Sequence, residues 1–166
     1  MWHLATVPFL IHAFAMMVDE AWFHRRRGLP LWERVGHPLD TLSVLACYVM
    51  ALTLPRTTAG FGVFVSAAIF SCLFVTKDEW MHAKHCTGAE MWLHSFLFVM
   101  HPILLGIVGA WWLAISRPAG YSPMESGPAF FAVFLAMQTG LTALFLGYQI
   151  LYWNGPWKPA LAEPRP

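Results

Sequence analysis

Hydrophobic residues run along this chain in five long stretches, residues 2–18, 39–54, 61–75, 91–115 and 129–153. A helix that crosses a bilayer needs about 20 largely apolar residues. The first three stretches reach that length only if their helices continue into the polar residues beside them. The pattern therefore predicts an all-α protein with five transmembrane helices.

The breaks between these stretches are rich in residues that end helices. They lie at residues 28–30, 55–60, 87–88 and 117–128, where proline and glycine recur. The proline-rich tail after Asn154 is expected to be irregular. We therefore expect one membrane domain over residues 1–166, without a separate soluble domain.

The two halves of the chain resemble each other. His82 follows His24 by 58 residues and His94 follows His37 by 57, so residues 1–56 match residues 60–116. Both halves begin on the same side of the membrane, which is typical of a parallel repeat about an axis along the membrane normal. The first four helices are therefore expected to form a pseudo-twofold bundle. The helix over 128–153 has no counterpart, and its polar residues would line a cavity or bond to neighbouring helices.

Composition supports a membrane protein, since 58% of the 166 residues are hydrophobic and 11% are charged. No basic cluster alternates with aromatic residues, so we expect no nucleic-acid partner. The cysteines Cys47, Cys72 and Cys86 lack CxxC spacing, and two lie within apolar stretches, so no disulfide framework is expected.

The basic residues predict the orientation in the membrane. Most lie on one side of the predicted helices, namely Arg25, Arg26, Arg27, Arg34, Lys77, Lys84, Lys158 and Arg165. Only Arg56 and Arg117 lie on the other side. The positive-inside rule places the first side, with the C-terminus, in the cytoplasm and the N-terminus outside, as in a bacterial-type inner membrane. The run 25–27 is interpreted as a topology signal that contacts lipid headgroups.

A carboxylate four residues before a histidine occurs four times. The pairs are Glu20 and His24, Glu33 and His37, Asp78 and His82, and Glu90 and His94. Residues at i and i+4 lie on one face of an α-helix. With nine acids and eight histidines in the chain, chance supplies about 0.4 such pairs. The four pairs lie at the basic side of the predicted helices, and together they predict a metal site.

Other polar residues extend these faces. Asp40 and His85 follow a paired histidine by three residues, and His101 lies deeper on the face of His94. These three side chains would be extra ligands or would orient the ligating imidazoles. On an ideal α-helix Asp19 and Glu79 point about 100° away from the neighbouring carboxylates, so they are less favoured.

Four converging helix faces would offer four carboxylates and four imidazoles, enough for two metal ions. This arrangement resembles the di-iron four-helix-bundle proteins, in which helix pairs supply Glu and Glu-x-x-His. The resemblance covers about residues 1–105. The spacing departs from that motif, because three residues separate each acid from its histidine, although Glu79 and His82 do read as Glu-x-x-His.

The resemblance implies two iron ions that activate oxygen at the cytoplasmic membrane face. Such an oxidoreductase would act on a lipid or another apolar substrate and would require an electron donor. Manganese and zinc also suit mixed oxygen and nitrogen ligands. With zinc the same residues would support a membrane hydrolase.

Two readings without catalysis remain open. A metal or proton transporter would need polar residues across the bilayer, where only His12, His101, Gln138 and Gln149 offer a path. The acid–histidine pairs would otherwise be structural ion pairs at helix ends. His3 and His12 are interpreted as histidines that bond to a neighbouring helix.

Overall fold

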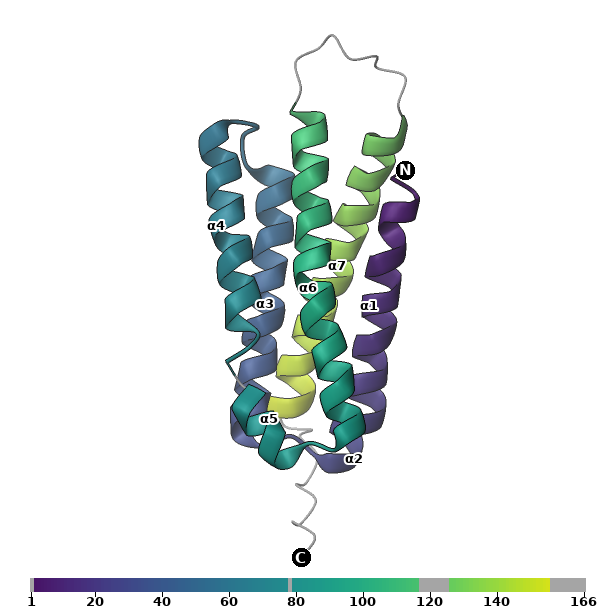
Figure 1. Cartoon of the computed structure of the whole chain (residues 1–166), viewed down its shortest axis with the longest axis vertical. Helices are drawn as coiled ribbons and strands as arrows, with labels where there is room; N and C mark the ends of the chain where they lie inside the picture. Colours follow the sequence, from purple (N-terminus) through teal and green to yellow (C-terminus); the bar gives the residue numbers. More distant parts are fainter. Residues whose placement is uncertain (1, 78, 117–125, 156–166) are drawn as a thin grey trace, which may run out of the picture.

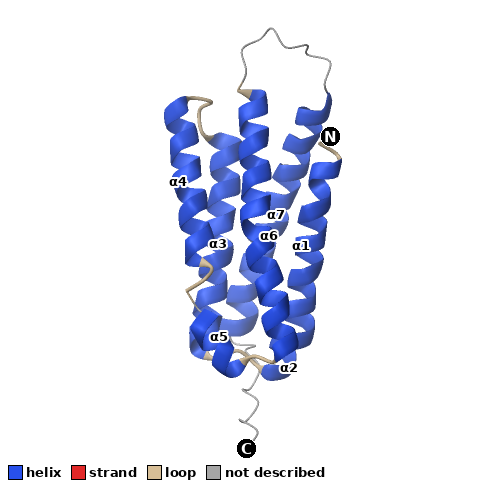
Figure 2. Cartoon of the chain, viewed as in Figure 1, coloured by secondary structure: helices blue, strands red, loops and turns tan. Residues whose placement is uncertain are grey.

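The structure is a computed structural model that describes residues 2–77, 79–116 and 126–155 (Figure 1). Every regular element in these ranges is a helix (Figure 2). The elements are the 3-10 helix η1 Leu4–Thr6, α1 Val7–Val18, the π-helix η2 Asp19–His24, α2 Arg25–Arg27, α3 Leu31–Thr53, α4 Thr58–Phe74, α5 Glu79–His85, α6 Gly88–Ile115 and α7 Ser126–Asn154. The all-α prediction is confirmed for this part of the chain.

Four helical segments are long and apolar enough to cross a membrane. They are Leu4–Arg27, Leu31–Thr53, Gly88–Ile115 and Pro128–Asn154. α4 is apolar but has only 17 residues, which rise about 26 Å, slightly less than the hydrocarbon core of a bilayer. Four of the predicted spans therefore have the length and composition that crossing a membrane requires.

The long helices form one bundle in which successive helices alternate in direction (Figure 1). α3 packs against both α4 and α7, while α6 packs against α1 and α4. α7, the helix without a counterpart in the repeat, therefore belongs to the bundle and lies along α3. The end of α1, the start of α3, α5 and the start of α6 meet at one end of the bundle (Figure 1).

The opposite half of the bundle has an aromatic core. Phe9, Phe64, Trp111, Trp112 and Phe131 are each at most 2% exposed. Phe64 stacks on Trp112 with ring centroids 5.8 Å apart, and Phe9 meets Phe131 edge-on at 5.9 Å. Such aromatic packing fills space and excludes water. The aromatic core therefore separates the polar end of the bundle from the other membrane face.

Two short turns shape the polar end. Gly28 has φ 75°, a conformation that favours glycine, and it reverses the chain between α2 and α3. Thr87 caps α6, because its Oγ1 accepts a hydrogen bond from the backbone nitrogen of Glu90 at 3.3 Å. Glu33 and Glu90 consequently lie in the first turns of α3 and α6, facing the same end.

Candidate metal centre

Four imidazoles form a closed ring at the polar end, one each from η2, α3, α5 and α6. We call His24, His37, His82 and His94 the histidine ring. Successive centroids around it are 4.8 Å (His24–His37), 6.1 Å (His37–His82), 4.4 Å (His82–His94) and 6.1 Å (His94–His24) apart. The structure thus brings together all four histidines of the predicted acid–histidine pairs.

Five buried nitrogens of this ring have no hydrogen-bond partner among the described residues: Nε2 of His24 and His37, both nitrogens of His82, and Nδ1 of His94. Nε2 of His24 lies 3.2 Å from Asp19 Oδ2, but the contact is not aligned as a hydrogen bond. A buried polar atom left without a partner costs about 1–3 kcal/mol. Burial lowers the pKa of His82 to about 3, so this imidazole is neutral and keeps a free lone pair. These nitrogens fit the requirements of metal ligands.

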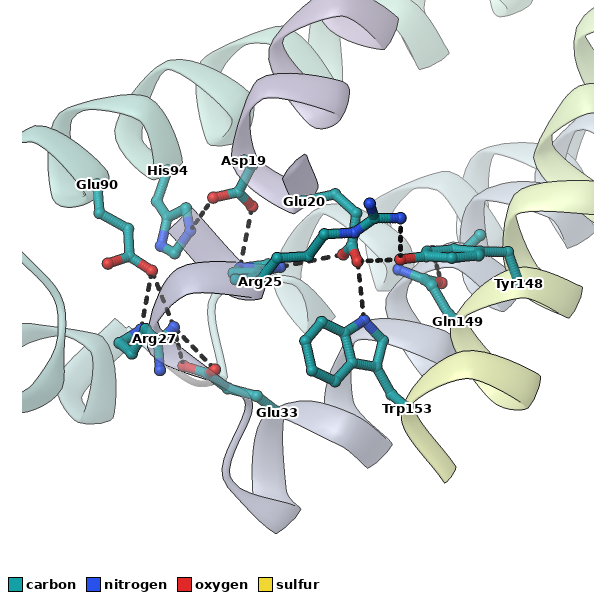
Figure 3. A network of polar contacts seen from close by, with 12 residues as sticks. Asp19, Glu20, Arg25, Arg27, Glu33, Glu90, His94, Tyr148, Gln149 and Trp153 are labelled. Atoms are coloured by element: carbon teal, nitrogen blue, oxygen red, sulfur yellow. Dashed lines mark hydrogen bonds and ion pairs between the residues drawn. The ribbon is translucent and has the colours of Figure 1, made fainter. Parts of the chain in front are cut away.

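Asp19 lies between two imidazoles of the histidine ring, although helical periodicity predicted that it would be a less favoured metal ligand. Its Oδ2 is 3.2 Å from His24 Nε2, and its Oδ1 is 3.2 Å from His94 Nε2 (Figure 3). The cause is local: residues Asp19–His24 form a π-helix, in which residues five apart are bonded. Asp19 is five residues before His24, so the two side chains align. The periodicity of an ideal α-helix does not predict this alignment of Asp19 with His24.

The ligand atoms fall into two groups that share no residue. The first group is Asp19, His24, Glu90 and His94, and the second group is Glu33, His37 and His82. Within each group the ligand atoms lie within 4.8 Å of one another. Each group contains two imidazoles and at least one carboxylate, a ligand set that suits a first-row transition metal. The residues of each group therefore fit a metal ion.

Cys86 forms a third grouping with His82 and His94, again with ligand atoms within 4.8 Å. The sequence pattern did not identify this cysteine as a ligand. Burial raises the pKa of the Cys86 thiol to about 12, so without a metal it is protonated. All three cysteines are free, as predicted.

Glu20, a predicted ligand, is not in either ligand group and instead contacts the imidazole of His24. Its Oε2 lies 3.3 Å from His24 Nδ1. Its Oε1 accepts hydrogen bonds from Tyr148 Oη at 2.5 Å and from Trp153 Nε1 at 2.9 Å (Figure 3). A carboxylate on one imidazole nitrogen fixes the tautomer and the orientation of the ring. Both donors come from α7, which no sequence motif connected with the site.

Arg27 turns into the site. Its Nη2 lies 2.8 Å from Glu33 Oε2 and 2.8 Å from Glu90 Oε1 (Figure 3). It thereby joins one carboxylate of each group and balances part of their charge. The sequence interpretation of lipid contact does not hold for Arg27, while Arg25 and Arg26 are exposed.

Replacing Arg27 with glutamine is expected to destabilise the metal-free protein by about 3 kcal/mol, because Glu33 and Glu90 are at most 1% exposed and would lose their cation. Arg26→Gln is the matched control at an exposed position, with an expected change within about 0.5 kcal/mol. Unfolding in detergent measures both. Equal stability of the two variants would contradict a structural role for the Arg27 ion pairs.

Two further predicted residues lie near the histidine ring but outside the two groups. Asp40 binds Lys77, with 2.7 Å between Oδ1 and Nζ. His101 lies deeper in the bundle, where its Nε2 is 3.0 Å from Ser71 Oγ. Both side chains line a cavity of about 360 Å³ that opens onto the histidine ring.

The remaining predicted residues lie on or before α5. His85 is exposed on α5 and is not part of either group. Asp78 lies outside the described residues. Glu79, which the sequence disfavoured, is 42% exposed, and its Oε2 is 4.0 Å from His82 Nδ1. Of the candidate ligands on α5, only His82 belongs to one of the two ligand groups.

Comparisons with models of protein families, with curated proteins and with solved structures give no significant match to this chain. Its function has to be inferred from the side chains themselves.

Proposed function

We propose that the two groups hold two iron ions and that the protein is a membrane-integral oxidoreductase that uses oxygen to oxidise a lipid or another apolar compound. The observation that carries the proposal is the set of five buried imidazole nitrogens without partners in one histidine ring. Imidazole and carboxylate ligands suit iron, and they also suit manganese or zinc.

Each of the two ligand groups would hold one metal ion. Asp19, Glu20, Glu33 and Glu90 are buried carboxylates with four negative charges, one of which Arg27 neutralises, so three remain to offset the four positive charges of two divalent ions. Glu20 holds His24 in one orientation, so the ring nitrogen facing Asp19 stays available for a metal.

Bound iron would supply the redox chemistry for reaction with oxygen, while an external partner would supply electrons. The chain supplies the surroundings. The aromatic core closes the bundle on the far side of the histidine ring, and the cavity beside the ring is large enough for a small apolar molecule. Because the cavity leads to the histidine ring through an apolar bundle, the proposed substrate is a compound that dissolves in the membrane.

Zinc-dependent hydrolysis is the second candidate, because Cys86 lies with His82 and His94 and a thiolate favours zinc. Transport has less support. The four polar residues that would form a path, His12, His101, Gln138 and Gln149, all line the cavity, but the aromatic core lies beyond it.

The topology is also part of the proposal. We infer that α4 crosses the membrane as a fifth span and that the two halves are a tandem repeat. Arg27 binds Glu33 and Glu90, which are 57 residues apart and occupy equivalent positions in the two halves, as a pseudo-twofold bundle requires. We also propose that the histidine ring lies at the cytoplasmic face and the N-terminus outside, which the positive-inside rule supports because Arg25 and Arg26 are exposed beside the ring.

Metal analysis of the protein purified from membranes tests the proposal. We expect about two iron ions per chain, one for each ligand group, together with a charge-transfer absorption band after aerobic purification. Bound zinc with hydrolytic activity would replace the proposal with the second candidate. A protein that retains no metal after desalting but carries metal ions or protons across liposome membranes would overturn it in favour of transport.

A further inference from the structure

We propose that the cavity binds one unbranched hydrocarbon chain, which enters from the bilayer between α1 and α7 and reaches the histidine ring. Oxidation of that chain rests on the proposed function, whereas its binding rests on the cavity alone. Three features support the inference: where the cavity opens, how long it is, and which polar groups in its wall are already bonded.

The opening lies between two levels at which α7 contacts α1 and its continuation η2. Near the N-terminus, Phe9 of α1 meets Phe134 of α7 with ring centroids 5.4 Å apart, and at the polar end Tyr148 of α7 donates to Glu20 of η2. Between these levels the cavity is lined by Met17 of α1 and Leu141 of α7, which are also 67% and 58% exposed. α7 slants away from α1 toward the polar end in Figure 1. The cavity therefore reaches the outer surface of the bundle between these helices.

This opening faces hydrocarbon. Both Met17 and Leu141 lie within segments of membrane-spanning length. α1 and α7 contribute no acid, lysine or arginine to the cavity wall, which from these helices consists of His12, Ala13, Met16, Met17, Gln138, Leu141, Thr142, Phe145 and Gln149. A molecule dissolved in the bilayer can enter without losing hydration, whereas a charged solute would have to cross hydrocarbon first.

The cavity is long enough for an alkyl chain. Its wall extends from His37 to Tyr48 on α3 and from Gln138 to Gln149 on α7, about 16 Å in each case at 1.5 Å per residue. Since carbon atoms in contact lie about 4 Å apart, an extended alkyl chain has a cross-section of about 20 Å² and fills about 320 Å³ over that length. The cavity volume of about 360 Å³ therefore has room for such a chain.

Several polar groups of the cavity wall away from the histidine ring have partners within the protein. Thr41 Oγ1 donates to Gln149 Oε1 at 2.8 Å, and Thr142 Oγ1 donates to the backbone oxygen of Gln138 at 2.8 Å. His101 is bonded to Ser71. A saturated chain can therefore lie along these groups without leaving them unpaired, which would otherwise oppose its binding.

Photolabelling of the full chain in phospholipid vesicles tests this. One arm uses a free long-chain fatty acid with a mid-chain diazirine, and the other arm uses a phospholipid that bears the same chain. Comparing the two arms shows whether the bound chain comes from a free fatty acid or from a phospholipid. We expect label on Tyr48 and Leu97, which line the cavity and are 2% and 8% exposed. Excess unlabelled fatty acid or lipid of the same kind should suppress that label. Label confined to lipid-facing residues in both arms would overturn the inference.

A variant at the opening sharpens the test. Leu141→Trp is expected to lower labelling of Leu97 about tenfold, because the indole fills the entrance. Leu144→Trp is the matched control on α7, since Leu144 is 71% exposed and does not line the cavity. Ala13→Trp narrows the entrance from α1 and should repeat the effect. Unchanged labelling of Leu97 in both entrance variants would refute entry between α1 and α7.

Metal content, measured on the same samples, separates the two proposals. Bound metal without label in the cavity would refute the chain-binding inference and leave the metal centre intact. Label in the cavity without bound metal would refute the proposed function instead. The substitutions at Leu141 and Leu144 lie outside the two ligand groups, so neither is expected to change metal content.

Discussion

Replacing His94 with alanine is expected to lower metal affinity more than about a hundredfold, beyond the range seen when only a supporting residue of a metal site is lost. His94 belongs to the first ligand group, and its ring is 4.4 Å from that of His82 in the second. His37→Ala should have a comparable effect. Bound metal per chain after desalting, followed by titration of the metal-free protein, measures the loss.

His3→Ala is the control for these variants. His3 lies at the other end of the bundle, where its ring is 4.2 Å from that of Phe130. We expect this variant to keep its metal. Equal losses from His3→Ala and His94→Ala would show that histidines serve folding in general and would remove the case for a metal centre.

Replacing Asp19 with asparagine is expected to have the second largest effect, a loss of metal affinity between about tenfold and a hundredfold. Asparagine keeps the shape of the side chain but removes the charge and one acceptor oxygen beside His24 and His94. Glu20→Gln should cost about tenfold, because Glu20 acts on the metal only through the orientation of His24. Metal titration of both variants gives the order of the two effects.

This order tests the π-helical turn. In an ideal α-helix Glu20 would face the metal and Asp19 would point about 100° away. A larger loss from Glu20→Gln than from Asp19→Asn would therefore indicate α-helical geometry at residues 19–24 and contradict the structure. Thermal unfolding of the metal-free variants checks that neither substitution simply unfolds the bundle.

The sequence alone was sufficient to predict the long apolar helices and the convergence of the four histidines, although it did not predict that α4 ends at Phe74 and that α5 is a separate helix from Glu79. Long apolar stretches leave few other structures in a bilayer, because all backbone polar groups must be bonded within the segment. Histidines at the ends of such stretches, four residues after an acid, are costly to expose to lipid and turn toward the interior. His24, His37, His82 and His94 could thus be assigned to one site.

Only the tertiary structure decided the rest of the site. Asp19 faces the site because residues 19–24 form a π-helix, and Arg27, beside the turn at Gly28, pairs with Glu33 and Glu90. Tyr148 and Trp153 reach Glu20 across 128 and 133 residues. Periodicity reports which residues share a face of one regular helix. It carries no information on a local change of register or on which distant helix packs alongside, and these two features determine the ligands, their supports and the cavity.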